Sequence, residues 1–374
     1  MVRGESLEKK EEDKVLPKLK SLGKNLLNEI KSGTSPTLEF LARGLDNVIY
    51  DEKNKILVLG NRKEKRVFLS ASQAKKFMQT VAVAAKCKKF KEENLHTSIR
   101  GLFYQLKFTL GEDIEEDLFE EQTESNQIVE DLEVLLGTKR EDLNLSTDRK
   151  GVVAGPLIIK DKFAGTTTTI DCTKMGRSGW MIPSDVDNGM EFVKCEADYV
   201  LVVEKDALWQ RLNEDQFWKK ENCILITPKG QASRGCRRLI RKLADMKLPI
   251  YGLMDCDAWG WYIYWTIKTG SMNLAYIGSE ISTPEIKFIG VTMKDIEKYP
   301  FLKKLTIKAK DVDIKRAEEM LSYPWISMHK EWVEELKKVI ETKKKLEQDA
   351  LQGPRLTFVG DYIKEKIENK EFLP

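Results

Sequence analysis

The sequence predicts an α/β protein of several domains, with a largely parallel sheet in its second half. Its 374 residues exceed the length of one ordinary domain. From about residue 198 onward, short runs that are apolar throughout alternate with helical stretches, a pattern typical of parallel strands covered on both faces. Carboxylates follow two of these runs, and ligands collect at the carboxyl ends of strands in such sheets. We therefore expect a ligand site at that edge.

The first half predicts separate helices and short strands. Residues 5–31 carry leucines and valines at helical spacing, which predicts an amphipathic helix covered either by the protein's own core or by a partner. Further elements are predicted along this half, namely short strands within 47–60 and 65–70 and helices at 72–90 and 97–109. A serine cap starts the first of these helices, and Thr97 or Ser98 opens the second.

Two further segments complete the first half. Residues 111–133 contain eleven acids and no base, so we expect a solvated helical face that repels nucleic acid. Residues 151–172 are rich in β-branched residues and punctuated by glycines, which predicts a hairpin. We find no internal repeat and no low-complexity linker.

Composition excludes several classes of protein. Charged residues make up 33% of the chain but the net charge is only +3, so a nucleic-acid surface must come from the local distribution of charge. No apolar run approaches the roughly 18 residues of a membrane span, and the N-terminus has no signal-peptide core, so we expect a cytoplasmic protein. Six dispersed cysteines without a CxxC, and only two histidines, argue against a zinc site and against a histidine base.

Acids follow two of the four predicted strands of the second half. These strands lie within 198–206, 222–230, 248–257 and 286–292, and residues 233–246 form a helix between the second and third. Glu204 ends the first run, and Asp255 and Asp257 end the third. If those strands are neighbours, three carboxylates converge into a site that suits Mg²⁺. The plainer alternative is a strand that runs into an ordinary Asp-rich turn.

Three kinds of enzyme place a DxD at a metal. Phosphatases of the haloacid dehalogenase type require Thr or Val two residues after the second Asp, where this chain has Trp259. Sugar-nucleotide transferases also use a DxD, but no donor-binding pattern is present here. The Toprim arrangement has a strand-ending Glu and then, after another βα unit, the DxD. Only the Toprim arrangement matches this order of Glu and DxD along the chain.

The helix before the DxD strand is strongly basic. Against one acid, Asp245, this region carries Lys229, Arg234, Arg237, Arg238, Arg241, Lys242 and Lys247. Such a helix is often only a solvated face. Its position just before the acids, and its start at the glycine-bearing loop 228–235, favour contact of Lys229, Arg234, Arg237 and Arg238 with DNA phosphates.

Several segments together resemble the A subunit of DNA topoisomerase VI, a type IIB enzyme related to the protein that makes meiotic double-strand breaks. The resemblance extends over nearly the whole chain and is carried by "NVIYDEKNKILVLG", "SQAKKFMQTVAVA", "SIRGLFYQLK", "DYVLVVEKDALWQRL" and "KLPIYGLMDCDAWGWYIYWTIKTGS" followed by "STPEIKFIGV". It implies that Tyr104 is the nucleophile and that Glu204, Asp255 and Asp257 bind Mg²⁺. Two departures are visible: Ala258 stands where the family has proline, and the loop before the basic helix differs.

The resemblance also implies a fold and a division into domains. It implies a winged-helix, CAP-like domain and a Toprim domain with a Rossmann-like parallel sheet. The predicted divisions are 1–68, an N-terminal segment that could contact a partner subunit, 69–148, the winged-helix domain with the tyrosine, and 149–374, the Toprim domain with a helical C-terminal part.

The implied activity is cleavage of both strands of double-stranded DNA through 5′-phosphotyrosyl links in a chromosome-associated homodimer. The chain has no nucleotide-binding signature, so ATP hydrolysis is expected in a separate B subunit with a GHKL-type ATPase, within a heterotetramer. The alternatives are a stand-alone protein that makes double-strand breaks, and a non-catalytic winged-helix protein that binds DNA.

The residue chemistry near the tyrosine agrees with this implication. A phenol has a pKa near 10 and is a poor nucleophile at neutral pH unless something favours the phenolate. Arg100 lies four residues before Tyr104, so on a helix the two share a face and the guanidinium could assist the phenolate or hold the phosphate. Gly101 between them is a weak helix former.

Overall fold

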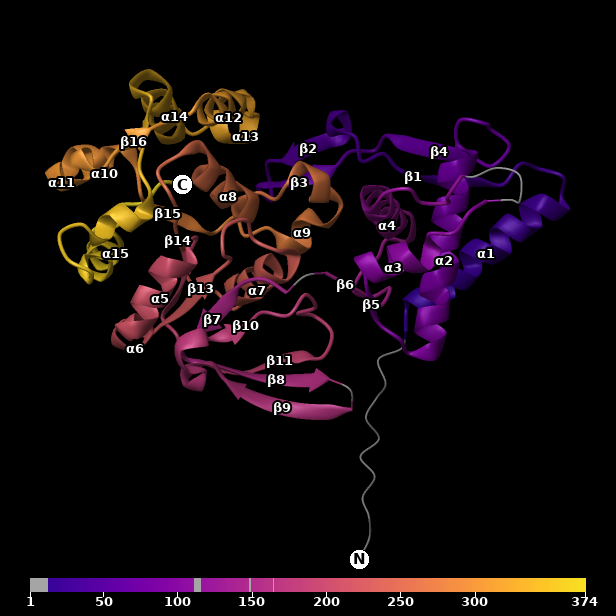
Figure 1. Cartoon of the computed structure of the whole chain (residues 1–374), viewed down its shortest axis with the longest axis horizontal. Helices are drawn as coiled ribbons and strands as arrows, with labels where there is room; N and C mark the ends of the chain where they lie inside the picture. The colour runs from indigo at the N-terminus through magenta and orange to yellow at the C-terminus, as the bar shows by residue number, and fades with distance from the viewer. Residues whose placement is uncertain (1–12, 111–115, 148, 164) are drawn as a thin grey trace, which may run out of the picture. The chain divides into compact units, whose positions relative to one another are not determined.

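Two units divide the chain in the computed structural model, which describes residues 13–110, 116–147, 149–163 and 165–374. The first unit contains the described residues of Met1–Asn47 and Gly60–Thr147, and the second contains those of Val48–Leu59 and Asp148–Pro374 (Figure 1). The segment 48–59 thus belongs with the second unit. The functional division into 1–68, 69–148 and 149–374 remains a prediction.

Helices form most of the first unit. Its elements are α1 (Val15–Lys31), β1 (Thr37–Leu41), β4 (Lys63–Val67), α2 (Ala74–Glu93), β5 (Thr97–Ser98), α3 (Ile99–Leu106), α4 (Gln122–Leu136) and β6 (Leu145–Ser146). Strand β1 pairs antiparallel with β4, and β5 pairs parallel with β6. Apolar side chains of the four helices share one core, which includes Val15, Leu19, Val83, Phe90, Leu102, Phe103, Val129 and Leu132.

Several predictions for this unit are confirmed and others are corrected. The amphipathic helix exists over 15–31 and packs on the protein's own core, while residues 5–12 lie outside the described residues. Ser98 caps α3 by accepting a hydrogen bond from the Gly101 amide at 3.0 Å, as expected. The predicted cap at Ser72 is wrong, since α2 begins after Gln73 without a side-chain cap. Strand β1 was not predicted.

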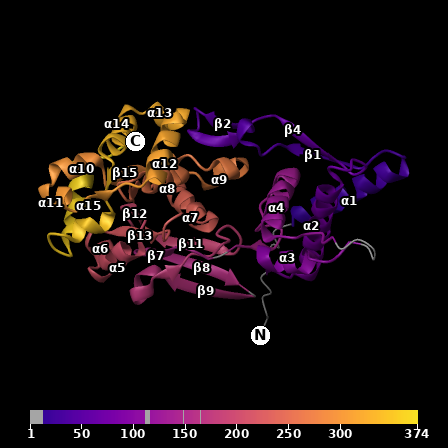
Figure 2. The same cartoon turned by 45° about the horizontal axis from the view of Figure 1, so that its top comes forward.

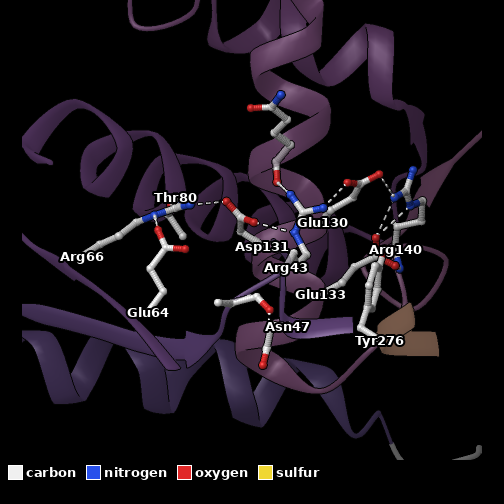
Figure 3. Close-up of polar contacts among 12 residues, drawn as sticks. Arg43, Asn47, Glu64, Arg66, Thr80, Glu130, Asp131, Glu133, Arg140 and Tyr276 are labelled. Carbon is white, nitrogen blue, oxygen red and sulfur yellow. Dashed lines mark hydrogen bonds and ion pairs between the residues drawn. The ribbon is translucent and has the colours of Figure 1, made fainter. Parts of the chain in front are cut away.

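The acidic segment is less solvated than predicted. From Gln122 onward it lies in α4, in which Asp131 and Glu133 are buried. Arg43 and Arg66 both pair with Asp131, and Arg140 pairs with Glu133 (Figure 3). Because buried carboxylates are retained only with such partners, these acids tie α4 to the arginines around it and do not form a free anionic face. Residues 111–115 lie outside the described residues.

The second unit is built on a six-stranded sheet. Its strands, in spatial order, are β10 (Trp180–Met181), β7 (Val152–Ala154), β13 (Cys223–Thr227), β12 (Tyr199–Val203), β14 (Ile250–Leu253) and β15 (Lys287–Gly290). The last four are mutually parallel, as the sequence predicts. Segment 151–172 contains the predicted hairpin as β8 (Leu157–Phe163) and β9 (Thr166–Asp171), which form a second sheet with β11 (Met190–Cys195). Its first residues instead extend the main sheet as β7.

Helices connect the parallel strands and cover the sheet. These are α5 (Asp206–Glu214) and α6 (Phe217–Lys220) after β12, α7 (Arg234–Asp245) after β13, and α8 (Ala258–Lys268) after β14. The chain moves from β12 outward to β13, and then back across β12 to β14. Right-handed crossovers therefore put α5 on one face and α7 and α8 on the other (Figures 1 and 2). The strand order reverses between β12 and β14, which makes the carboxyl ends of these two strands the expected ligand site.

The remainder of the second unit surrounds this sheet. It comprises the hairpin β2 (Val48–Asp51) and β3 (Ile56–Leu59), and the helices α9 (Gly278–Ile281), α10 (Met293–Lys298), α11 (Pro300–Lys304), α12 (Asp311–Ser322), α13 (Pro324–Ser327), α14 (Lys330–Thr342) and α15 (Phe358–Glu368). An isolated bridge pairs Leu346 with Cys256, so the segment after α14 lies directly against the DxD.

Candidate functional site

The ends of β12 and β14 bring the three predicted carboxylates together. The two strands are paired in parallel, with Val203 opposite Leu253, so Glu204 and Asp255 follow at the same edge. The amide of Asp255 donates to Glu204 Oε2 at 3.0 Å. Glu204, Asp255 and Asp257 are between 6% and 8% exposed. The neighbouring strands required by the sequence argument are therefore present.

Backbone amides fix one oxygen of each aspartate. Asp257 is the N-cap of α8, and its Oδ1 accepts from the amides of Trp259 at 3.0 Å and Gly260 at 2.8 Å. The amide of Gln348 donates to Asp255 Oδ1 at 2.8 Å. These bonds orient the carboxylates before any ligand arrives, because the start of α8 holds Asp257 and the segment at Gln348 holds Asp255.

Lysines face the second oxygen of each aspartate. Lys205 Nζ lies 3.2 Å from Asp255 Oδ2 and is shared with Glu347 and Asp349. Lys345 Nζ lies 3.2 Å from Asp257 Oδ2 and 3.2 Å from an oxygen of Asp313. Sequence reasoning missed both lysines. Lys205 could have been noticed because it directly follows Glu204, whereas no local signal connects Lys345 with residues 88 positions earlier.

The electrostatics of Glu204 and Asp255 favour a cation. Burial raises the pKa of Glu204 to about 8, and the negative charge of Asp255 adds to the shift. Burial also raises the pKa of Asp255, while the amide of Gln348 and the ammonium of Lys205 act in the opposite direction. Clustered, desolvated carboxylates of this kind are stabilised as anions by added positive charge.

The donor set fits Mg²⁺, but the side chains do not enclose an ion. Carboxylate oxygens are the ligands that Mg²⁺ prefers, and it uses few protein ligands. As placed, no group of three or more His, Cys, Asp or Glu side chains could hold a metal ion within the described ranges. Lys205 and Lys345 account for the second oxygens of both aspartates. A metal bound by these acids would therefore compete with the two ammonium groups.

Close backbone packing supports the DxD turn. A Cβ added to Gly260 would lie 2.6 Å from the Asp255 carbonyl oxygen and 2.9 Å from its amide nitrogen, so only glycine fits there. Ala258, where the resemblance in sequence led us to expect proline, is the first residue of α8. Proline is tolerated at the first helical position because its amide would have no intrahelical acceptor. Either proline or alanine therefore fits the first position of α8.

Tyr104 and Arg100 lie on α3 in the first unit. Tyr104 is 62% exposed, whereas its neighbour Phe103 is buried and packs against it at a ring distance of 5.2 Å. Arg100 is exposed in the first turn of the same helix, one turn before Tyr104. No hydrogen bond or ion pair of either side chain occurs among the described residues. The phenol is thus presented to solvent, and a core role for it is excluded.

The basic helix is only partly exposed. Ser233 caps α7, Lys229 before it is exposed, and Arg238 is half-buried, pairing with Asp187 at 2.8 Å. Arg234 is also half-buried. Arg237 is 2% exposed, so the direct DNA contact predicted for it does not fit this structure. Burial lowers the pKa of Arg237 to about 9, and the charge of Arg234 adds to this effect.

No helix in the described part of the chain is both long and apolar enough to cross a membrane.

Three family descriptions match successive parts of the chain. Residues 75–145 match the type IIB DNA topoisomerase family, and residues 150–196 match the all-beta domain of the DNA topoisomerase VI alpha chain. Residues 199–367 match the Toprim domain that topoisomerase 6 A subunits share with Spo11. The last range includes all three carboxylates, and the first includes Tyr104. The four parallel strands with their strand-end acids thus belong to a Toprim domain, whereas β7 and β10 of the same sheet lie in the range of the all-beta match.

Full-length relatives cover almost the whole chain. The A subunit of type 2 DNA topoisomerase 6 from Pyrococcus horikoshii is 41% identical over 96% of this chain and 96% of its own length. The protein of the same name from Saccharolobus shibatae is 40% identical over 93% of both chains. The A subunit of DNA topoisomerase 6 from Arabidopsis thaliana is 32% identical over 93% of this chain and 79% of its own.

Proposed function

This chain belongs to the family of DNA topoisomerase VI A subunits, and on that premise we propose that it is the subunit that cleaves DNA in an ATP-dependent type IIB topoisomerase. The observation that carries the proposal is the convergence of Glu204, Asp255 and Asp257 at the point where the strand order reverses, in a chain that also presents an exposed Tyr104. Opening both strands of one duplex and passing another through the gap would relax or decatenate DNA.

Mg²⁺ would be held by Glu204, Asp255 and Asp257. When bound, it would neutralise phosphate charge and assist departure of the 3′ oxygen. The chain's own residues prepare this position, because backbone amides hold one oxygen of each aspartate and one of Glu204. Lys205 and Lys345 balance the charge of the aspartates and must give way to the ion.

Tyr104 would supply the nucleophile. Its phenolic oxygen attacks a backbone phosphorus, forming a P–O bond to the tyrosine while the bond from phosphorus to the 3′ oxygen breaks. The phenol loses its proton to solvent, and the 3′ oxygen gains one. Arg100, one turn earlier on α3, would favour the phenolate or hold the phosphate. Resealing is the reverse of this step and needs no other energy source.

The proposed partners follow from the same assignment. Residues 69–148 of the first unit would act as the winged-helix, CAP-like DNA-binding domain, since α2, α3 and α4 pack together beside short strands. Two copies would form a homodimer that cuts both strands, each tyrosine acting beside the other copy's acids. A B subunit with a GHKL-type ATPase would complete a heterotetramer and supply the ATP dependence. Lys229, Arg234 and Arg238 remain candidates for phosphate contact.

The first test is the Tyr104→Phe variant. We expect it to bind duplex DNA with nearly unchanged affinity, because phosphate contacts dominate that affinity and one hydroxyl contributes little. Covalent protein–DNA adducts, trapped with denaturant and resolved on gels, should disappear. Phe103→Leu is a suitable companion variant, because it changes the buried neighbour and leaves the phenol in place.

The same assay separates the proposal from its rivals. Adducts that persist in Tyr104→Phe would show that another residue is the nucleophile. A wild-type protein that binds DNA without ever forming adducts, even with Mg²⁺ and a B subunit, would be a non-catalytic binding protein. Adducts that form at full rate without any ATPase partner would instead identify a stand-alone protein that makes double-strand breaks.

A further inference from the structure

Trp259 is an exposed indole beside the carboxylates. All eight tryptophans lie within the described residues, and seven of them are buried or half-buried, whereas Trp259 is 42% exposed. It follows Asp257 by two positions, and its amide donates to Asp257 Oδ1 at 3.0 Å. The backbone of Trp259 therefore helps to orient a proposed metal ligand, and the indole is attached to that same turn.

A guanidinium supports this indole from α12. The Arg316 guanidinium carbon lies 4.5 Å from the centre of the Trp259 ring and 4.7 Å from that of Tyr262, so it stands between the two rings. Arg316 is itself held by Glu319 at 2.8 Å. One face of the indole is thus covered by a fixed cation, and its exposed area lies on the remaining surface. No aromatic ring of the described residues packs against Trp259.

Three other rings of the second unit pack on one another. Tyr323 stacks on Trp325 at 4.8 Å with an interplanar angle of 12°, and Tyr50 of the β2–β3 hairpin lies 6.3 Å from Trp325. All three are half-buried and have ring partners within the unit. Trp259 differs from these three because its ring contacts a cation and no other ring among the described residues. It differs from Tyr262, which contacts the same guanidinium, because Tyr262 is half-buried and Trp259 is exposed to a ligand.

Flat exposed rings bind nucleobases by stacking, and this binding tolerates any base because each has a π-face. We propose that Trp259 is a base-stacking residue that receives a nucleobase next to the phosphate being cut. The proposal rests on the proposed function, since it takes the strand bound at Glu204, Asp255 and Asp257 to be DNA. Arg316 is a positioning residue that holds the ring from behind. The ligand class is an unstacked or partly unstacked base of the cleaved duplex.

The test uses the full-length dimer carrying Tyr104→Phe, so that the DNA stays intact. Duplexes carry 2-aminopurine at successive positions around the cleavage position that is mapped with the wild-type protein. At one position, we expect the protein to quench the fluorescence. Trp259→Ala should remove this quenching, and Trp259→Phe should retain part of it.

Abasic duplexes separate a base contact from a general loss of affinity. With an intact duplex, Trp259→Ala should weaken binding about tenfold, in keeping with one stacked base. With the duplex that lacks the base at the sensitive position, the same substitution should change nothing. Leu356→Ala is the matched control, since Leu356 is an apolar residue of the same unit that is 60% exposed.

Three outcomes would overturn the proposal. Trp259→Ala could weaken binding equally on intact and abasic duplexes, or no position could respond in fluorescence. Trp259 variants could instead change the concentration at which the dimer forms and leave the base contact unchanged, which would place the ring at the interface between two copies. A Tyr104→Phe protein without any affinity for duplex DNA would contradict the proposed function itself, a different failure from the loss of this one contact.

Discussion

Asp257 holds the start of α8 with one oxygen and faces Lys345 with the other. Asparagine caps helices about as well as aspartate, so Asp257→Asn should fold normally while removing one charge from a hard-cation site. We expect Mg²⁺ affinity, measured by calorimetry, and DNA cleavage to fall together. Glu204→Gln should behave in the same way.

The alanine substitution at this position is the control for the cap. Asp257→Ala loses the bonds to the amides of Trp259 and Gly260 as well as the charge, so it should also lower stability by about 1 kcal/mol. A folded Asp257→Asn protein that binds Mg²⁺ and cuts DNA like the wild type would show that Asp257 is only a capping residue in an Asp-rich turn.

Arg237, unlike the exposed Lys229, is not expected to contribute to DNA affinity. Its Nε and Nη2 have no hydrogen-bond partner among the described residues, and it is buried. Because an unpaired buried charge is costly, Arg237→Met should leave stability unchanged or raise it, with DNA affinity unaltered. Lys229→Ala should weaken binding to all sequences and reduce the slope of the salt dependence by about 1. Equal losses of affinity in the two variants, measured by salt titration, would mean that Arg237 reaches DNA.

Sequence could place the site but not its charge balance. Acids at the ends of two apolar runs predicted the meeting of Glu204 with Asp255, because parallel strands end at a common edge. The sequence could not predict the contact of Lys345, which reaches Asp257 only because the segment after α14 pairs with Cys256. Nor could it predict the burial of Arg237, since an arginine-rich helix does not reveal which of its arginines face the sheet.

Elements with a strong local signal were predicted better than those stabilised by distant partners. The four parallel strands follow from apolar runs, and α7 follows from the helical stretch between two of them, both visible locally. Strand β1 exists because it pairs with β4, more than 20 residues away. Its short apolar run alone did not predict a strand. In α4, acids that look solvated in sequence are buried because arginines from elsewhere in the unit neutralise them.

Helix α1 has two faces with different expected roles. Leu19 is 4% exposed in the core of the first unit, whereas Leu27 and Ile30 are each 58% exposed. Leu19→Ala should cost about 2–5 kcal/mol in urea unfolding, as buried leucines do, and Leu27→Ala should change stability by less than about 0.5 kcal/mol. Equal effects of the two substitutions would contradict this packing.

The exposed face of α1 can be tested for contact with the B subunit. If Leu27 and Ile30 meet that partner, Leu27→Glu should spare folding and DNA binding but reduce ATP-stimulated cleavage when the B subunit is added. Because the inner face of α1 belongs to the core, deletion of residues 1–31 should destabilise the first unit and is the poorer experiment.

At the scale of the whole molecule, the question is which tyrosine works with which acids. Tyr104 lies in one unit and Asp255 in the other, so a working site can be built within one chain or across a homodimer. The family resemblance implies the second arrangement. A heterodimer of one Tyr104→Phe chain and one Asp255→Asn chain distinguishes the two, and Asn at 255 keeps an acceptor for the Gln348 amide.

In the arrangement across the dimer, the chain with Asp255→Asn contributes its intact tyrosine to the intact acids of the Tyr104→Phe chain. One composite site is then fully wild type and the other is doubly defective. We expect this heterodimer, purified through two different affinity tags, to nick one strand of a duplex and leave the other whole. Sites built within single chains would each carry one defect, and no strand would be cut. Absence of nicking, with both parent homodimers folded and bound to DNA, would therefore exclude the arrangement across the dimer.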